Sequence, residues 1–236
     1  MKNIKTKISQ HVPRRLLNVY GSTKRYFLKQ FAPASEKVHV DMATIHHGVF
    51  NITYRGIPTL RCPFDYVIYQ MILMDLKPDL VIEIGTNYGG TTLYLADLMD
   101  TLGHGLIHSI DLETKAPDIV KNHPRVTLFD FGWQGYDVKN ISSLNTVLVI
   151  DDGSHMYEDV IGALQKFSPS VSAGSYYIVE DGIIDELGQR KQYSGGPLKA
   201  IREFLPSHPE YVVDRQYCDM FGKNATFNVN GYLRKI

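Results

Sequence analysis

From residue 63 onward, hydrophobic and polar positions form two alternating kinds of segment. Short apolar runs that end at glycine or acidic residues are typical of buried strands. Longer segments with apolar residues three and four positions apart indicate amphipathic helices. Residues 63–76 belong to the second kind, and residues 79–85 belong to the first. The alternation predicts an α/β domain with a doubly wound, mostly parallel sheet that helices cover on both faces.

The pattern also predicts the bounds of the main elements. Strands are expected at residues 79–85, 106–111, 125–129, 146–151, 176–180, 211–215 and 227–234. Helices are expected at residues 63–76, 91–99, 157–167 and 197–205. Lys77-Pro78 ends the first helix, and Pro197 suits the first turn of the last one. The sheet is therefore predicted to have seven strands.

The N-terminal segment has a pattern of its own. Ile4, Ile8 and Val12 recur at helical spacing within 35 residues that contain eight basic side chains and no acidic one. We therefore divide the chain into a basic helical arm, residues 1–35, and a body, residues 36–236. Such an arm either packs as a solvated extension on the body or on another subunit, or contacts an anionic membrane surface.

Composition narrows the class of protein. Hydrophobic residues make up 44% of the chain and charged residues 21%, which excludes a disordered or collagen-like protein. Basic and acidic residues are equal at 25 each, so no overall charge indicates a nucleic-acid partner. No apolar run approaches the roughly 20 residues that span a bilayer, and no secretory signal is evident. We expect a cytoplasmic protein in which Cys62 and Cys218 are free thiols.

A glycine-rich turn lies between the first predicted strand and the next helix. It reads Glu83-Ile-Gly85-Thr-Asn87-Tyr-Gly89-Gly90, and glycine there lets the backbone turn sharply and approach a ligand. The nicotinamide dinucleotide fingerprint G-x-G-x-x-G requires a second glycine at the position of Asn87, which weakens that interpretation. A purely structural turn is the alternative.

The second predicted strand ends at Asp111, 26 positions after Gly85. An acidic residue at this place in an α/β sheet can accept hydrogen bonds from the hydroxyls of a ribose. The alternative is a surface carboxylate that caps a loop. Together, the turn and this acid favour a nucleoside-bearing cofactor.

Acidic pairs follow the fourth and fifth predicted strands, at Asp151-Asp152 and at Glu180-Asp181. If these strands are neighbours, their ends lie about 4.8 Å apart, and the carboxylates repel one another. A cation would relieve the repulsion, and oxygen ligands suit Mg²⁺, Ca²⁺ or Mn²⁺. The alternative is a set of solvent-exposed helix caps.

His155 follows Asp152 by three residues and is predicted to overhang the same crevice. A histidine suits general-base chemistry because its pKa lies near neutral pH. The alternative is a structural histidine that caps the following helix.

The order of these motifs resembles one family of methyltransferases. The motifs are Arg55-Gly56, Tyr69-Gln70, KPDLVIEIGTNYGGTTLYLADLM, VLVIDDGSH and YYIVEDG. They are similar to those of the family that contains CmcI-type proteins, rhamnosyl O-methyltransferases and macrolide-sugar O-methyltransferases, within the class I S-adenosylmethionine-dependent methyltransferases. The likeness runs from about Tyr54 to Glu203.

The resemblance implies a Rossmann-like fold with strand order 3-2-1-4-5 and an antiparallel closing strand. It also implies roles for individual residues. His155 would be the general base, and the metal ligands would be Asp152, Glu180 and Asp181. The cofactor contacts would be Glu83, Gly85, Thr86, Asn87, Gly89, Asp111 and Asp130. Near Asp130 the segment FDFGW departs from the glycine-aspartate pair that is more usual in the family.

The function that the resemblance implies is metal-dependent O-methylation. The methyl group would pass from S-adenosylmethionine to a hydroxyl of a sugar, glycan or glycolipid acceptor, with Mg²⁺ or another oxygen-binding divalent cation. A small or lipid-linked saccharide would be the substrate, and the protein would form a homo-oligomer and bind no nucleic acid. It would be cytoplasmic, with residues 1–35 as candidates for contact with the inner face of the membrane. The alternatives are a nicotinamide-dependent sugar oxidoreductase and a non-catalytic Rossmann-like binding module.

Overall fold

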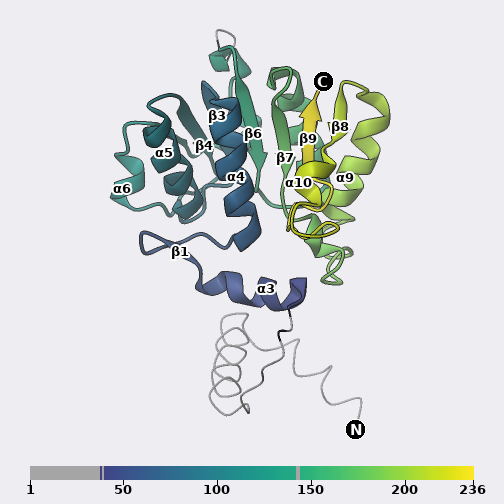
Figure 1. Cartoon of the computed structure of the whole chain (residues 1–236). Coiled ribbons are helices and arrows are strands. Elements are labelled where there is room, and N and C mark those ends of the chain that lie inside the picture. Colours follow the sequence, from purple (N-terminus) through teal and green to yellow (C-terminus); the bar gives the residue numbers. More distant parts are fainter. Residues whose placement is uncertain (1–37, 39, 142–143) are drawn as a thin grey trace, which may run out of the picture. The chain divides into compact units, whose positions relative to one another are not determined.

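The central sheet organises the structure, a computed structural model that describes residues 38, 40–141 and 144–236. Within these residues the sheet has seven strands in the order β5-β4-β3-β6-β7-β9-β8 (Figure 1). Their bounds are β3 Leu80–Ile84, β4 Leu106–Ile110, β5 Val126–Phe129, β6 Val147–Asp151, β7 Tyr176–Val179, β8 Tyr211–Val213 and β9 Tyr232–Lys235. The predicted arm, residues 1–35, lies outside the described residues. Asp41–Ile236 form one compact unit, to which the following description applies.

The strand order places the end of β3 beside the end of β6. Strands β3 to β7 are parallel to their neighbours, whereas β9 is antiparallel to both β7 and β8. In order of sequence, the parallel strands lie 3-2-1-4-5, as the resemblance implied. Ile84 is in register with Ile110 on one side and with Asp151 on the other. The carboxyl ends of β4, β3 and β6 therefore lie side by side at one edge of the sheet, which is where open α/β sheets bind their ligands.

Helices cover both faces of this sheet. The helices are α3 Met42–Gly48, α4 Pro63–Leu76, α5 Gly90–Leu102, α6 Asp118–Lys121, α7 Gly132–Gly135, α8 Tyr157–Phe167, α9 Gly196–Phe204 and α10 Arg215–Cys218. Successive strand residues point to opposite faces, so Val81 packs with α4 and α5, and Ile82 packs with α8 and α9. Two apolar cores result, one on each face, as the run of buried residues in β3 and β6 predicts.

A smaller apolar cluster joins segments near the start of α4. Val49, Cys62, Ile183 and Phe227 are its buried members, and side chains of α3 pack against it. Beside it, β1 Thr53–Tyr54 and β2 Ile57–Pro58 form a two-stranded antiparallel sheet. Cys62 and Cys218 are buried free thiols, which confirms the prediction for both.

The closing strands are shorter than predicted because nearby acids take up backbone donors. The strand expected from residue 227 begins only at Tyr232, since the Phe227 N–H donates to Asp65 Oδ2 at 3.1 Å and not to a neighbouring strand. The strand expected to reach residue 215 ends at Val213. There Asp214 caps α10 by accepting the Gln216 N–H at 2.8 Å.

The helix predicted at residues 91–99 extends to Leu102. Gly103 stops it in the left-handed conformation and donates its N–H to Asp100 O. None of the helices in the described part of the chain is both long and apolar enough to cross a bilayer.

Candidate active site

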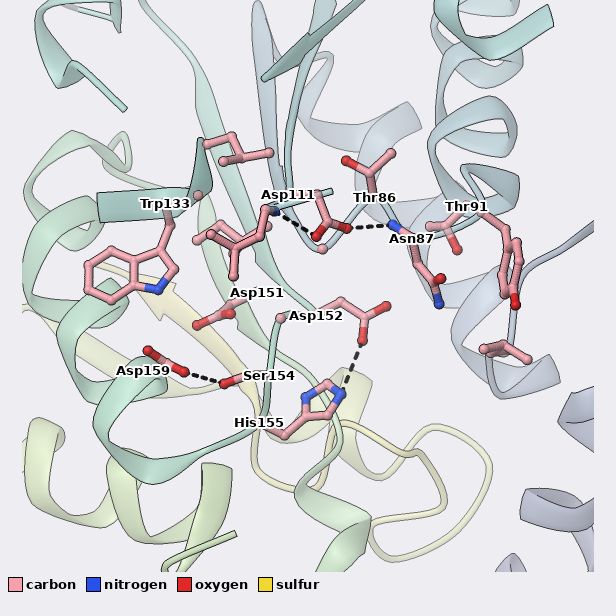
Figure 2. A pocket seen from close by; sticks show the side chains of 18 of the residues that line it. Thr86, Asn87, Thr91, Asp111, Trp133, Asp151, Asp152, Ser154, His155 and Asp159 are labelled. Carbon is pink, nitrogen blue, oxygen red and sulfur yellow. Dashed lines mark hydrogen bonds and ion pairs between the residues drawn. The ribbon is translucent and has the colours of Figure 1, made fainter. Parts of the chain in front are cut away.

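A cavity of about 410 Å³ lies at the carboxyl ends of β3, β4 and β6 (Figure 2). Most of the residues that the sequence analysis singled out line it together. They are Gly85, Thr86, Asn87, Asp111, Asp152, His155 and Asp181. The glycine turn and the acidic pairs, separate in the sequence, therefore face one space.

Gly85 brings the backbone of β3 against the loop that follows β6. Its φ of +103° lies in the region that favours glycine, and an added Cβ would come within 2.0 Å of the Asp152 carbonyl oxygen. The Asp152 N–H in turn donates to Ile84 O at 2.8 Å. The turn and the first candidate metal ligand are thus one packed unit.

Asn87 and Asp111 are joined across the cavity wall. Asn87 has a φ of +47°, which explains why the glycine of the dinucleotide fingerprint can be replaced there by asparagine. Its N–H donates to Asp111 Oδ2 at 2.7 Å, and the Leu112 N–H donates to Asp111 Oδ1 at 2.7 Å. These bonds fix the Asp111 carboxylate at the end of β4, as Figure 2 shows for the bond to Asn87.

Glu83 lies beneath the turn and does not line the cavity. Its side chain is fully buried, and its Oε2 accepts hydrogen bonds from the hydroxyls of Thr92 and Ser109. Burial raises the pKa of this carboxyl, while these two hydroxyls lower it. Glu83 Oε1 has no hydrogen-bond partner among the described residues. In this structure Glu83 supports the turn from inside.

Two further predicted cofactor residues also lie away from the cavity wall. Gly89 packs against α6, where an added Cβ would come within 3.1 Å of Val120 Cγ1. Asp130 is exposed and is not among the residues that line the cavity. The sequence also departs from the family pattern here, since FDFGW stands where the family more usually has a glycine-aspartate pair.

Asp152, His155 and Asp181 converge on one point of the cavity. His155 Nε2 lies 3.2 Å from Asp181 Oδ2 and 3.8 Å from Asp152 Oδ1. One ligand atom from each residue lies within 4.8 Å of the others, which is close enough to share a cation. His155 does not cap α8: the N-cap is Met156, and no side-chain hydrogen bond caps the helix.

Both His155 and Asp181 are held in the left-handed backbone conformation. Their φ angles are +58° and +56°, in a region that costs residues other than glycine about 1–2 kcal/mol. The His155 ring packs edge-on against the ring of Tyr193, at 6.2 Å between centroids. Strain of this kind persists where the surrounding structure fixes a side chain in place.

Glu180 occupies a different environment from its neighbour Asp181. It is buried and bound by Arg61 Nη1, and its Oε1 also accepts the hydroxyl of Tyr69 at 2.6 Å. Arg61 Nη2 reaches Asp152 Oδ2 at 3.1 Å. The guanidinium of Arg61 therefore bridges two of the three predicted metal ligands.

Sequence reasoning did not identify Arg61, Tyr69 or Trp133 as site residues. Arg61 lies in a segment without a recognisable pattern, and Tyr69 was noted within the Tyr69-Gln70 motif but was given no role in the site. Trp133 lines the cavity and packs on Gly162, where a Cβ would come within 2.7 Å of the indole. The one sequence signal for Trp133 was the unusual segment FDFGW, which ends at this residue.

Asp151, the other acid at the end of β6, also lines the cavity. Burial raises its pKa to about 7, and the Tyr177 hydroxyl donates to its Oδ2 at 3.2 Å. Asp151 is 4% exposed, and desolvation is the largest cause of the rise in its pKa, which the Tyr177 hydrogen bond opposes.

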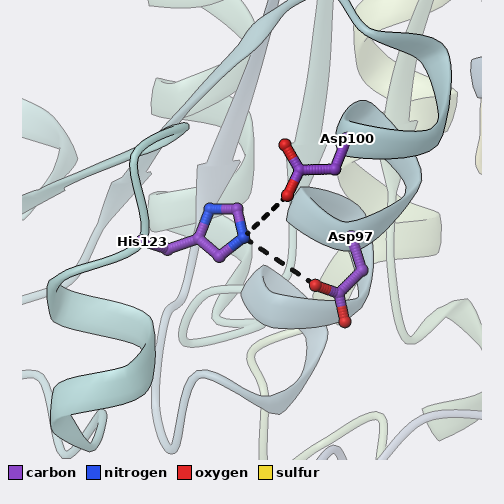
Figure 3. A group of neighbouring side chains, drawn as sticks. All are labelled: Asp97, Asp100 and His123. Atoms are coloured by element: carbon purple, nitrogen blue, oxygen red, sulfur yellow. Dashed lines mark ion pairs between the residues drawn. The ribbon is translucent and has the colours of Figure 1, made fainter.

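Figure 3 shows a second group of carboxylates and imidazole, none of whose members lines the cavity. His123 Nε2 is 3.4 Å from Asp100 Oδ2 and 3.8 Å from Asp97 Oδ1. Arg55 pairs with Asp97, and Arg125 pairs with Asp100, so two guanidinium groups already balance these acids. The cluster ties α5 to neighbouring loops.

Comparison with known proteins identifies the family. Residues 47–236 match the family described as Rhamnosyl O-methyltransferase/CmcI. The chain is 31% identical over 193 residues to a rhamnosyl O-methyltransferase of Mycobacterium leprae, covering 77% of this chain and 82% of the relative. A rhamnosyl O-methyltransferase of Mycobacterium bovis is 30% identical over 191 residues, covering 77% of each chain.

Solved structures show the same fold. A CmcI structure described as Mg-SAM superposes with a TM-score of 0.61 at 19% identity, covering 89% of this chain and 84% of that chain. A CmcI structure described with SAH has the same TM-score and identity and covers 89% and 91%.

The strand order, the glycine turn and the cavity at the ends of β3 and β6 define a Rossmann-like methyltransferase. The chain belongs to the Rhamnosyl O-methyltransferase/CmcI family. It is an S-adenosylmethionine-dependent O-methyltransferase, so the predicted family, fold class and enzyme class are confirmed. The oxidoreductase and the non-catalytic module are thereby disfavoured.

Proposed function

We propose that this protein transfers a methyl group from S-adenosylmethionine to a hydroxyl of a sugar, with a divalent cation, Mg²⁺, in the cavity. The observation that carries the proposal is the convergence of Asp152, His155 and Asp181 beside the Gly85 turn. The names of the relatives, rhamnosyl O-methyltransferases, support the sugar, and the CmcI structure with Mg and SAM supports the two cofactors.

The cavity has the features that a nucleoside-bearing donor requires. Gly85 lines the cavity, and no side chain fits there because a Cβ would come within 2.0 Å of the Asp152 carbonyl oxygen. The Asp111 carboxylate accepts three backbone N–H groups, from Asn87, Leu112 and Glu113, and retains a lone pair for a ribose hydroxyl. Trp133 supplies an aromatic surface for a purine in the same cavity. We assign the donor to Gly85, Thr86, Asn87, Asp111 and Trp133.

The donor set near β6 and β7 fits a hard divalent cation. Asp152 and Asp181 offer carboxylate oxygens within 4.8 Å of each other and of His155. Glu180 lies next to Asp181 in the chain and contacts Arg61, which also contacts Asp152. Oxygen-rich ligand sets of this kind suit Mg²⁺. We propose that Asp152, Glu180 and Asp181 hold the ion.

His155 is placed to take the proton from the acceptor. When bound, the donor supplies an electrophilic methyl group and the cation supplies charge that lowers the pKa of a nearby hydroxyl. His155 Nε2 faces the carboxylates, so it can accept the hydroxyl proton there. Asp181 Oδ2, 3.2 Å away, stabilises the imidazolium that results. His155 lines the cavity, and the edge-on contact with the Tyr193 ring supports its imidazole there.

A methyl-transfer assay tests this function. Purified protein is incubated with labelled S-adenosylmethionine, Mg²⁺ and a panel of rhamnosides, nucleotide sugars and glycolipids. Label on a sugar hydroxyl, lost after chelation and restored by Mg²⁺, is the expected result. Full activity that survives exhaustive chelation contradicts the metal, and transfer only to acceptors without a sugar contradicts the substrate class.

Three further proposals concern the N-terminal arm, the cellular location and the partners of the protein. We propose that residues 1–35 form a separate basic arm that contacts an anionic membrane, where a lipid-linked saccharide would be presented. Eight basic residues without an acidic one support this. We also propose a cytoplasmic homo-oligomer that does not bind nucleic acid, in keeping with the equal numbers of basic and acidic residues.

A further inference from the structure

Arg61 is the most enclosed cation of the candidate active site. Its side chain is 1% exposed, and each nitrogen has a partner. Nε donates to Thr91 Oγ1 at 3.2 Å, Nη1 contacts Glu180 Oε1, and Nη2 contacts Asp152 Oδ2 at 3.1 Å. The guanidinium carbon also lies 4.7 Å from the centre of the Tyr69 ring. Arg61 therefore cannot leave the carboxylates without losing all its contacts.

Glu180 also contacts the Tyr69 hydroxyl, which is itself held by a residue that does not line the cavity. The Tyr69 hydroxyl that donates to Glu180 accepts a hydrogen bond from Asn228 Nδ2 at 3.1 Å. Asn228 is fully buried in the loop before β9. Arg61 and Tyr69 therefore hold the Glu180 carboxylate from two sides.

Arg61 changes the charge that a metal ion meets. Metal ligands bind in their deprotonated form, so Asp152, Glu180 and Asp181 present three negative charges. Arg61 contributes one positive charge in direct contact with two of them. The set then carries a net charge of −2, which one divalent ion neutralises.

We propose that Arg61 is the positioning residue that matches this carboxylate set to a divalent cation. This inference rests on the proposed metal site. Arg61 orients Asp152 and Glu180 through its two terminal nitrogens, and its charge disfavours ions of higher charge. Because Coulomb energy is proportional to the charge of the ion, loss of Arg61 strengthens the binding of a trivalent ion more than that of a divalent ion.

The test compares Tb³⁺ with Mg²⁺ on the full-length protein without donor or acceptor. Trp133 is the single tryptophan of the chain and lines the same cavity, so Tb³⁺ luminescence excited through tryptophan reports this site. Mg²⁺ affinity follows from competition. In Arg61→Met, the ratio of Tb³⁺ to Mg²⁺ affinity is expected to rise at least about fourfold, the value for a unit charge about 5 Å away in water. A loss of positioning alone would lower both affinities and leave their ratio unchanged.

Arg61→Lys separates charge from position. It keeps the charge but not the two-pronged contact, so both affinities are expected to fall while the ratio stays at the wild-type value. Arg125→Met, which removes a guanidinium paired with Asp100 outside the cavity, is the matched control and leaves the ratio unchanged.

Each outcome bears on one of the two proposals. An unchanged ratio in folded Arg61→Met, or a shifted ratio in Arg61→Lys, overturns the role of Arg61 and leaves the metal site standing. If Arg61→Met does not fold, Arg61→Gln carries the same expectation, and the Lys variant decides alone if both fail. A Tb³⁺ signal that is the same in Asp152→Asn as in wild-type protein overturns the metal site itself.

Discussion

Single residues of the candidate active site combine polar chemistry with burial or an unfavourable backbone conformation. His155 and Asp181 hold left-handed conformations, and Asp151 is a buried carboxyl with a raised pKa. Each departure costs stability, so each is open to a measurement that separates its structural cost from its contribution to the reaction.

Replacement of His155 is expected to slow catalysis without loss of binding. In His155→Ala, the single-turnover rate of methyl transfer should fall by about 10²- to 10⁴-fold, as for removal of a general base. Affinity for S-adenosylhomocysteine, measured by calorimetry, should stay near the wild-type value because the turn at Gly85 and Asp111 are unchanged.

His123→Ala is the matched control for His155. His123 also lies beside two aspartates (Figure 3), but it does not line the cavity. The control should lower the melting temperature and keep a normal rate per folded molecule. The same signature in His155→Ala would assign that residue a structural role only.

Asp151 predicts a pH dependence of stability. Its pKa of about 7 in the folded chain exceeds the ordinary value of 3.8, so between these values the native state binds more protons than the unfolded state. Stability from this group is therefore greatest below pH 3.8 and is lost as pH rises to about 7, by roughly 4 kcal/mol.

Asp151→Asn should remove this loss. Urea unfolding of the metal-free protein from pH 4 to pH 8 is the measurement, with wild-type protein in the same buffers. A variant whose free energy of unfolding falls with pH as steeply as that of wild type would show that another group is responsible.

At the scale of elements, the connection from β3 to α5 carries the active site because it is packed against the loop after β6. Gly85 is the contact point, and its missing Cβ leaves room for the Asp152 carbonyl. Gly85→Ala should lower the free energy of unfolding by about 2–4 kcal/mol, since it adds overpacking to the strain of a positive φ.

Gly174→Ala distinguishes these two causes. Gly174 has a φ of +81°, but an added Cβ there would meet nothing within 4 Å. Only the conformational cost of about 1 kcal/mol is expected. Equal losses in the two variants, measured by urea unfolding, would show that the close approach to Asp152 is not costly.

The sequence predicted elements where one physical rule dominated. The apolar runs of β3 and β6 are buried on both faces, and no other element type suits them. Residues 227–231 also looked strand-like, but Asp65, more than 160 positions away, binds the Thr226 hydroxyl and the Phe227 N–H. No local pattern contains that partner. Arg61 was missed for the same reason, because only the folded chain brings it to Glu180.

For the molecule as a whole, the basic arm predicts binding to anionic lipid. Each basic residue near such a surface contributes about 1 kcal/mol, and the effect falls with salt. Sedimentation with phosphatidylserine vesicles should therefore retain the full chain at low salt and release it at high salt. The chain that lacks residues 1–35 should stay in solution at both, and neutral phosphatidylcholine vesicles are the control. Equal partitioning of the two chains would contradict the proposal.

The two left-handed residues of the cavity have a consequence for the evolution of this enzyme. At positions 155 and 181, glycine or asparagine would relieve backbone strain, so selection for heat tolerance alone favours replacing His155 and Asp181. Under the proposed function, the same replacements remove the base and a metal ligand. Lineages adapted to higher temperature must therefore gain their stability elsewhere, and variants selected for stability without an activity screen should lose turnover first at these two positions.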